Sequence, residues 1–445
     1  MNGAKQQISR RGFFKHSAAA GAFMIASPRI LGRAGYAAPN DKLNIAAIGV
    51  GGRAEENLKQ CSSESYIAFC DVDDTRAAKS FNRYERVPKY KDYRVMLDKH
   101  ENEIDAVIIS TPDHTHAVAT LDAIRRGKHV YVEKPLAHSI YEVRTLMQAA
   151  KEQNVITQLG NQGHSYNDIR RICEWIWDGA IGPVTEVHAW YRNPYGDGKP
   201  LPNETPPVPD TLDWDLWLGP AKYRPYHPAY VPGKWRSWKA FGTGVLGDWV
   251  CHILDPAFWA LKLQAPESVL AANGGEYSPE RFPTESVIEW NFPAREEMPP
   301  VRVTWTYGRQ TDLPQLKDVK LDDWNQSAGA LLVGEKGCIV HGSHGGGNAR
   351  IIPESRAQEV KQPEETIPRV KGNHQQDWIH AIRENRPAGS NFNYGGPLTE
   401  VALLGVIATV HDGELLEWDA TGSRFKNPAQ ANDLIKPEFR EGWKI

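Results

Sequence analysis

The stretch KLNIAAIGVGGRAEENLKQ, residues 42–60, decides the fold because it joins a short apolar strand to a helix through a glycine loop. Leu43 to Ile48 is apolar and partly β-branched, as strands are. The loop reads G-x-G-x-x-A and ends at Ala54, which is small enough to keep the helix close to the strand. Strand, loop and helix N-terminus together predict a site for the pyrophosphate of a dinucleotide. The loop residues expected to hold it are Gly49, Gly51, Gly52 and Arg53.

A second strand, Tyr66 to Cys70, ends in an acid, Asp71, at the distance from the loop at which dinucleotide sites place one. Its carboxylate can bond both ribose hydroxyls of an adenosine and would repel a 2′-phosphate, so the sequence favours NAD over NADP. Arg53 and Arg76 keep NADP open as the alternative. The other role for Asp71, capping the next helix, suits Asp73 better.

Further strands and helices alternate with short connections up to residue 163, which predicts a parallel, doubly wound sheet of the α/β class. Polar residues follow the carboxyl ends of these strands, where such sheets bind their ligands. Lys134 in particular is expected beside a nicotinamide, and the alternative is a surface lysine at the start of a loop. The residues of this edge expected to contact the cofactor are Thr111, Pro112, His114, His116, Glu133, Lys134 and Gln162.

A second motif, GTGVLGDWVCHILDPAFWAL at residues 242–261, predicts a glycine loop running into a helix. Asp248 and His252 are four positions apart, so they share one helical face and could bind a sugar hydroxyl together. The alternative for His252 is a core or salt-bridged histidine. Neither H-x-x-x-H nor H-E-x-x-H spacing occurs, so no metal site is predicted.

These motifs resemble the glucose–fructose oxidoreductase, inositol dehydrogenase and rhizopine-catabolism family, Gfo/Idh/MocA. The likeness covers most of residues 42–400. The family implies a Rossmann domain followed by an α+β domain with a large, open, mostly antiparallel sheet that commonly mediates oligomers. It further implies a cis Lys134–Pro135 bond and Lys134, Asp248 and His252 as catalytic residues. The matching residues are Gly49 to Ala54, Asp71, Ser110 to Pro112, His114, His116, Glu133 to Pro135 and Gly247 to His252.

The expected second domain spans residues 164–427, after a Rossmann domain at 39–163, and its last helices return to the Rossmann side. Its segment at 341–350, HGSHGGGNAR, is rich in glycine and precedes no helix, so a flexible surface turn is predicted. The tail at 428–445 is predicted to be a surface extension.

A long loop at residues 195–244 is rich in Pro, Gly and aromatic residues, and ordered loops of such length are usually functional. Flat aromatic faces suit the C–H faces of sugars. Most of the rings are expected to pack the loop against its own sheet. Trp235, Arg236 and Trp238 are expected near the substrate.

The N-terminal stretch SRRGFFK at residues 9–15 is followed by a mild apolar run and a small-residue region ending at Ala37 and Ala38. This order predicts a twin-arginine export signal at 1–38, with the export machinery as partner and the periplasm as destination. A basic amphipathic helix is the alternative.

The composition excludes several classes of protein. The formal charge of −3 argues against a nucleic-acid partner, and no apolar run is long enough for a membrane anchor. The five cysteines are scattered without a C-x-x-C pair, so buried thiols are predicted rather than zinc or a disulfide framework.

The sequence therefore predicts an NAD(P)-dependent oxidoreductase acting on a hydroxyl of a sugar, polyol or glycoside. Because no replenished pool of NAD is expected outside the cytoplasm, the cofactor should be held tightly and recycled in the site. An NAD-dependent glycosidase or lyase that works by transient oxidation is the first alternative. A non-catalytic sugar- or nucleotide-binding protein is the second. A homodimer or homotetramer is expected.

Overall fold

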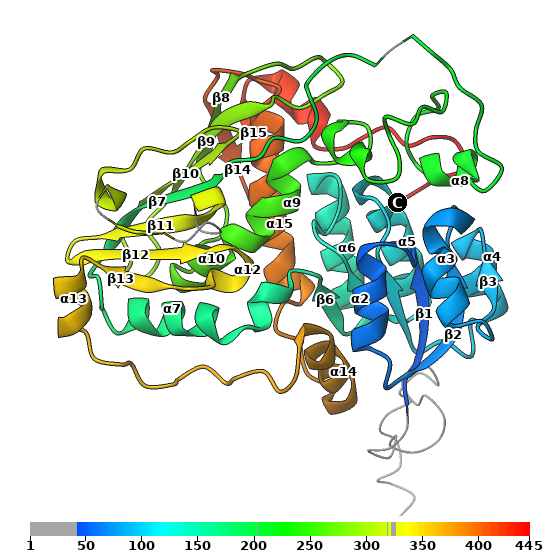
Figure 1. The fold of residues 1–445 in the computed structure, drawn as a ribbon, viewed down its shortest axis with the longest axis horizontal. Helices are drawn as coiled ribbons and strands as arrows, with labels where there is room; N and C mark the ends of the chain where they lie inside the picture. Colours follow the sequence, from blue (N-terminus) through cyan, green and yellow to red (C-terminus); the bar gives the residue numbers. More distant parts are fainter. Residues whose placement is uncertain (1–41, 202, 318, 322–325) are drawn as a thin grey trace, which may run out of the picture. The chain divides into compact units, whose positions relative to one another are not determined.

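The N-terminal domain is built on a parallel sheet (Figure 1). The computed structural model describes residues 42–201, 203–317, 319–321 and 326–445, so the predicted export signal lies outside the described residues. The strands of this sheet are β1 (Asn44–Ile48), β2 (Ser65–Cys70), β3 (Lys89–Tyr90), β4 (Ala106–Ile109), β5 (His129–Val132) and β6 (Thr157–Leu159). Their order is β3-β2-β1-β4-β5-β6 and every pair is parallel, which confirms the predicted doubly wound sheet.

Helices connect these strands, and local sequence signals set their ends. They are α2 (Arg53–Gln60), α3 (Asp74–Arg83), α4 (Tyr93–Lys99), α5 (Asp113–Arg125) and α6 (Ile140–Gln153). Asp73 caps α3 by accepting the backbone N–H groups of Thr75 and Arg76, as predicted. Asp71 is thereby left for another role.

The glycine loop needs its glycines for two different reasons. Gly49 has φ 74°, in the left-handed region that favours glycine. At Gly51 a Cβ would lie 2.4 Å from the backbone oxygen of Arg76, so the start of α3 approaches the loop too closely for any side chain. The sequence pattern predicted a glycine at position 51 only because a bound phosphate needs room there. The packing of α3 against the loop also requires a glycine at this position.

The second domain contains a large, mostly antiparallel sheet, as the resemblance implied. Its strands are β7 (Val184–Tyr191), β8 (Ser268–Gly274), β9 (Glu285–Phe292), β10 (Val301–Tyr307), β11 (Ala328–Gly334), β12 (Gly337–Gly342), β13 (Arg350–Ile352), β14 (Leu416–Asp419) and β15 (Arg424–Asn427). Their order is β13-β12-β11-β7-β10-β9-β8-β14-β15, and only the β7–β10 pair is parallel among these strands. Alternate residues of β9 are buried, so one face of this strand packs on the core.

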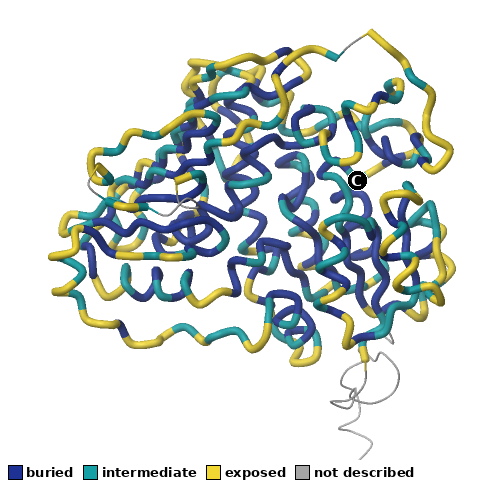
Figure 2. The backbone as a smooth tube through the Cα atoms, in the orientation of Figure 1, coloured by how far each residue is buried: buried dark blue, intermediate teal, exposed yellow. Residues whose placement is uncertain are grey.

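Helices and short 3₁₀ turns connect the strands of the second domain and pack around both sheets. They are η1 (Gln162–Ser165), α7 (Asn167–Trp177), α8 (Trp214–Leu218), η2 (Lys234–Ser237), α9 (Gly244–Ile253), α10 (Asp255–Ala260), η3 (Pro314–Leu316), α12 (Ser343–Gly346), α13 (Glu354–Glu359), α14 (His374–Glu384), α15 (Phe392–Ala408) and η4 (Ala429–Leu434). Helix α15 packs on α6 of the first domain and on α9 and β8 of the second, and α14 packs on α2. Both late helices therefore return to the Rossmann side as predicted, and Figure 2 shows the middle of the molecule deeply buried.

The segment at 341–350 is not the flexible surface turn that its glycines predicted. His341 and Ser343 are buried, and the loop packs against η1. A Cβ on Gly163 would lie only 2.2 Å from the backbone carbon of His344. The glycines here serve a close approach between two segments, which local sequence could not distinguish from a mobile turn.

The tail at 428–445 lies mostly at the surface, and only Ala431 and Trp443 in it are buried. After η4 the chain passes the long loop of the second domain, where the backbone N–H of Arg440 donates to the oxygen of Pro220 (3.0 Å). Trp443 is only 8% exposed and its ring lies 6.3 Å from that of Tyr93 on α4.

The cysteines of the described residues are buried and unpaired, as predicted. Within the same residues, no helix is long and apolar enough to cross a membrane.

His129 provides a test of the packing at the start of β5. Its Nδ1 accepts the backbone N–H of Ile156 (2.9 Å), and burial, assisted by Lys128, lowers its pKa to about 4. The unfolded chain therefore binds a proton at His129 more readily than the folded chain does. The stability that the neutral, buried imidazole of His129 contributes is present above pH 6.5 and is lost as the pH falls toward 4.

We expect His129→Asn, whose Oδ1 can accept the same N–H without titrating, to reduce the acid sensitivity of the fold. As the pH falls from 6 to 4.5, the free energy of unfolding, measured in urea, should decrease less in the variant than in the wild type. The two slopes should differ by about 1.4 kcal/mol per pH unit. Identical slopes in the two proteins would contradict the assignment.

Candidate active site

A cavity of about 390 Å³ lies along the carboxyl edge of the parallel sheet and reaches the second domain. It is lined by residues from the glycine loop, from the ends of β2, β4 and β5, and from α9. The predicted site residues on its wall are Gly49, Gly51, Arg53, Asp71, Thr111, Pro112, Glu133, Lys134, Gln162, Trp235, Arg236, Asp248 and His252. Two motifs more than a hundred residues apart in sequence therefore meet in one cavity.

Two predicted cofactor contacts, His114 and His116, do not line this cavity. The ring nitrogens of His114 face the backbone oxygens of Phe241 and Trp217, at 3.2 and 3.0 Å. Those of His116 face the oxygens of Pro135 and Thr111, at 2.7 and 2.8 Å. Both histidines are buried on α5 with their ring nitrogens beside backbone oxygens, and their contact with a cofactor stays a prediction.

Trp238 and Gly52 are also absent from the wall. Trp238 is 1% exposed, and its indole N–H donates to the oxygen of Ala229 (2.9 Å). It belongs to an aromatic cluster that packs the long loop, and its place near a substrate stays a prediction. Gly52 instead forms the N-cap of α2, where the guanidinium of Arg76 covers it.

Asp71 stands at one end of the cavity and is fixed by the backbone. Its Oδ2 accepts the N–H of Val50 (2.9 Å) and its Oδ1 that of Asp73 (3.0 Å). Burial raises the pKa of Asp71, and these two backbone bonds oppose that shift. The carboxylate therefore has a defined position beside the glycine loop.

Glu133 links the glycine-loop helix to the end of β5. Its Oε1 accepts the side-chain N–H groups of Asn57 (2.9 Å) and Arg53 (3.3 Å). These contacts hold the chain just before Lys134. The Lys134–Pro135 bond is cis, as the resemblance implied.

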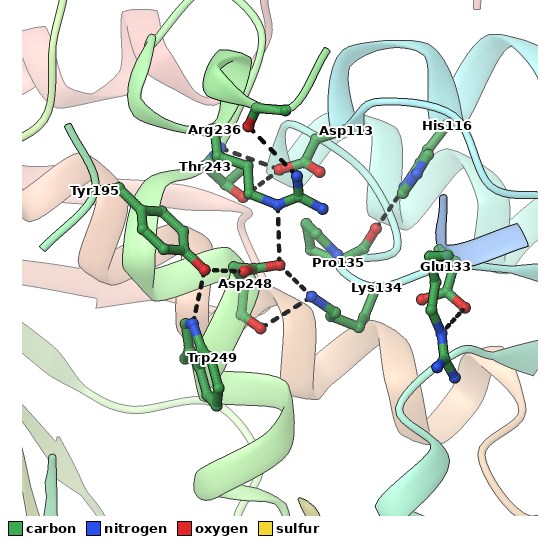
Figure 3. A network of polar contacts seen from close by, with 12 residues as sticks. Asp113, His116, Glu133, Lys134, Pro135, Tyr195, Arg236, Thr243, Asp248 and Trp249 are labelled. Carbon is green, nitrogen blue, oxygen red and sulfur yellow. Dashed lines mark hydrogen bonds and ion pairs between the residues drawn. The ribbon is translucent and has the colours of Figure 1, made fainter. Parts of the chain in front are cut away.

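An ion pair between Lys134 and Asp248 lies at the other end of the cavity (Figure 3). The ammonium also donates to the backbone oxygen of Asp248 (3.1 Å). The second carboxylate oxygen accepts the hydroxyl of Tyr195, which in turn accepts the indole N–H of Trp249 (2.7 Å). Arg236 adds a longer contact to Asp248, with its Nε at 3.4 Å.

The charges around Asp248 decide its protonation. Burial alone would raise the pKa of its carboxyl, but the positive charges of Lys134 and then Arg236 hold it below the ordinary range. Asp248 is therefore an ionised group that positions Lys134, and Arg236 rests over the ring of Trp235 at 4.2 Å.

His252 lies next to this ion pair on the same face of α9. It is 5% exposed, and among the described residues its Nδ1 has no hydrogen-bond partner. Burial, followed by the charge of Lys134, lowers its pKa well below the ordinary value. His252 is thus a neutral imidazole with an unused nitrogen in the cavity wall. No hydrogen bond joins it to Asp248 within the described part of the chain.

His344 stacks on His252, with ring centroids 4.2 Å apart. Burial, followed by the charge of Lys134, lowers its pKa to about 4. Sequence reasoning missed His344 together with Tyr195, Trp249 and Trp443. Trp249 adjoins Asp248 within the recognised motif and Tyr195 begins the long loop, so both carried a local signal, whereas His344 and Trp443 carried none.

The residues of the wall fit a dinucleotide. The glycine loop exposes backbone next to the N-terminus of α2, and Asp71 stands at the end of the neighbouring strand. The hydroxyl of Thr111 on this edge is buried without a partner, as is Nδ1 of His252. Searching the described residues reveals no group of His, Cys, Asp and Glu that could hold a metal ion.

Two family models match the chain. Residues 43–161 match "Oxidoreductase family, NAD-binding Rossmann fold" of Gfo/Idh/MocA, and residues 184–272 match its "Oxidoreductase family, C-terminal alpha/beta domain". Together they cover the Rossmann domain and the first part of the second domain.

Curated relatives match over parts of their length. A levoglucosan dehydrogenase of Pseudarthrobacter phenanthrenivorans is 26% identical over 182 residues, 41% of this chain and 38% of that protein. A 1,5-anhydro-D-fructose reductase of Ensifer adhaerens is 40% identical over 101 residues, 22% of this chain and 30% of that protein. The chain therefore aligns with well under two thirds of the length of these relatives.

Solved structures share the fold over a longer stretch. An aldose-aldose oxidoreductase from Caulobacter crescentus, complexed with glycerol, has a TM-score of 0.56 at 18% identity, over 85% of this chain and 100% of that one. An inositol dehydrogenase homolog from Azotobacter vinelandii, complexed with NAD+, has a TM-score of 0.58 at 14% identity, over 85% and 98%. Residues 43–161 and 184–272 are therefore similar to the NAD-binding Rossmann domain and to the C-terminal α/β domain of Gfo/Idh/MocA oxidoreductases.

Proposed function

We propose that this protein is an NAD-dependent oxidoreductase that acts on a secondary hydroxyl of a sugar, polyol or glycoside. The observation that carries the proposal is the single cavity that joins Asp71 to the cluster of Lys134, Asp248 and His252. A dinucleotide anchored at the first end would extend toward the second. The named activities of the relatives, on levoglucosan and on 1,5-anhydro-D-fructose, agree with a carbohydrate substrate.

In this proposal the residues of the chain handle the proton while the cofactor, when bound, supplies the hydride acceptor. His252 lines the cavity and its Nδ1 has no hydrogen-bond partner among the described residues, so this nitrogen is the proposed acceptor of the hydroxyl proton. Lys134 stabilises the developing alkoxide. Asp248 holds the ammonium of Lys134 in place. Its contacts support this role better than the alternative role, in which Asp248 would orient His252.

We expect Lys134→Met to bind NADH normally but to lose turnover by about a hundredfold or more, because the alkoxide loses its positive partner. Turnover would be measured on a panel of hexoses and glycosides, and binding by NADH fluorescence. Lys151→Met, an exposed lysine of α6 outside the cavity, is the matched control. Normal turnover in Lys134→Met would dismiss the role.

The same panel separates the alternative functions. Formation of a ketone supports the oxidoreductase, and release of an aglycone would point to the redox-assisted glycosidase or lyase. Binding of sugar without any product would point to a protein that only binds it. The favoured outcome is the ketone.

NAD is preferred over NADP in this proposal because the carboxylate of Asp71 is fixed where a 2′-phosphate would meet it. The predicted export signal at 1–38 leads to a second expectation. A protein in the periplasm should keep its cofactor and restore it within the site. Assembly into a dimer or tetramer stays a prediction.

Acid denaturation of the mature protein, purified without added cofactor from periplasmic extract, should release about one nicotinamide dinucleotide per chain. Tight retention is the reason, because ordinary dehydrogenases lose their coenzyme during purification. Chromatography of the acid extract measures the ratio and distinguishes NAD from NADP. Protein found only in the cytoplasm, or an extract without dinucleotide, would contradict the export or the retention, respectively.

A further inference from the structure

The C-terminal segment 436–445 is tied by several polar contacts to α8 and the residues that follow it, in the long loop of the second domain. The guanidinium of Arg440 donates to the backbone oxygens of Gly219 and Asp215, each at 2.9 Å. Its backbone N–H donates to the oxygen of Pro220 at 3.0 Å. Figure 1 shows the C-terminus beside α8, which is the helix that contains Asp215. We call this segment the C-terminal strap.

Trp443 is the residue that the strap places on the cavity wall. The guanidinium of Arg94 lies 4.4 Å from the centre of its ring, and Tyr93 supports it from α4. The ring also approaches Gly219, since a Cβ there would lie 3.9 Å from it. Trp443 is mostly enclosed by protein, at 8% exposed, and it also borders the cavity.

The position of Trp443 identifies which half of a dinucleotide it would meet. Tyr93 and Asp92, which follow β3, lie on the same wall, as do Val72 and Asp71 at the end of β2. If the carboxylate of Asp71 holds the adenosine ribose, the adenine lies beyond it, toward Trp443. The cluster around Lys134 is at the opposite end.

We propose that the C-terminal strap closes the adenosine end of the dinucleotide site, with the indole of Trp443 as the stacking wall for the adenine. This inference rests on the proposed function. Stacking on an aromatic ring strengthens the binding of a base by roughly five- to a hundredfold. Because Arg440 fastens the strap to α8, adenine leaves only when these contacts open or when it slides past the indole. The strap thus accounts for slow release of the cofactor.

The test compares the rate of NADH release from the loaded, full-length protein in the wild type, Trp443→Ala, Trp443→Phe, Arg440→Ala and one control variant. Release is followed by loss of NADH fluorescence after mixing with excess NAD+. We expect Trp443→Ala and Arg440→Ala to release NADH about fivefold faster or more. Trp443→Phe keeps an aromatic face and should stay close to the wild type. Trp177→Ala, which removes a half-exposed indole outside the cavity, is the matched control.

A second ligand makes the test specific to adenine. Reduced nicotinamide mononucleotide lacks the adenosine half, so its binding should be the same in the wild type and in Trp443→Ala. Equal losses for both ligands would mean that the variant damages the whole site, and would overturn the proposal. Slower release of NADH from Trp443→Ala would overturn it as well, because the indole would then occupy the place of the adenine.

Failure of the strap and failure of the proposed function give different results. If the wild type binds NADH and the release rate is unchanged in Trp443→Ala, only the strap is refuted. If the wild type binds no dinucleotide at all, the proposed function and the strap are refuted together. Circular dichroism confirms that each variant is folded before the rates are compared.

Discussion

A buried ion pair between the two domains is the interaction on which the site depends. Lys134 comes from the end of a strand in the parallel sheet, and Asp248 comes from a helix of the second domain. Removing two charges from water is costly, and the attraction between them offsets this cost only when their remaining hydrogen bonds are satisfied. Here the hydroxyl of Tyr195 and the guanidinium of Arg236 complete the carboxylate. The pair therefore links the two domains and also positions the ammonium of Lys134 in the cavity.

Much of the fold could be predicted because its signals are local. The strand, glycine loop and helix at residues 42–60 are contiguous, and the acid that ends β2 follows directly. The pairing of Asp248 with His252 on one face needed only the period of a helix. The nearness of Lys134 to Asp248 was different, because only the likeness to a known family brought together residues so far apart in sequence.

The differences between the expected and the observed positions have physical causes as well. His114 and His116 follow the end of a strand as ligand residues do, but the turn of α5 directs both rings into the protein, where backbone oxygens bond them. The aromatic residues of the long loop mostly form their own core, and two members of this core, Trp217 and Trp235, also border the cavity. His344 was missed because its loop is ordered by contact with a distant segment, and its glycines look the same as those of a mobile turn.

That contact between Gly163 and His344 has a mechanical consequence. Backbone meets backbone with no room for a side chain, at the place where the parallel sheet approaches the antiparallel one. Tightly packed backbones of this kind move as one body. A hinge that swung the two domains apart would first have to separate His344 from Gly163, whereas His344 and His252 belong to the same domain and would move together. Parting of the two sheets at this place would therefore break a close-packed backbone contact.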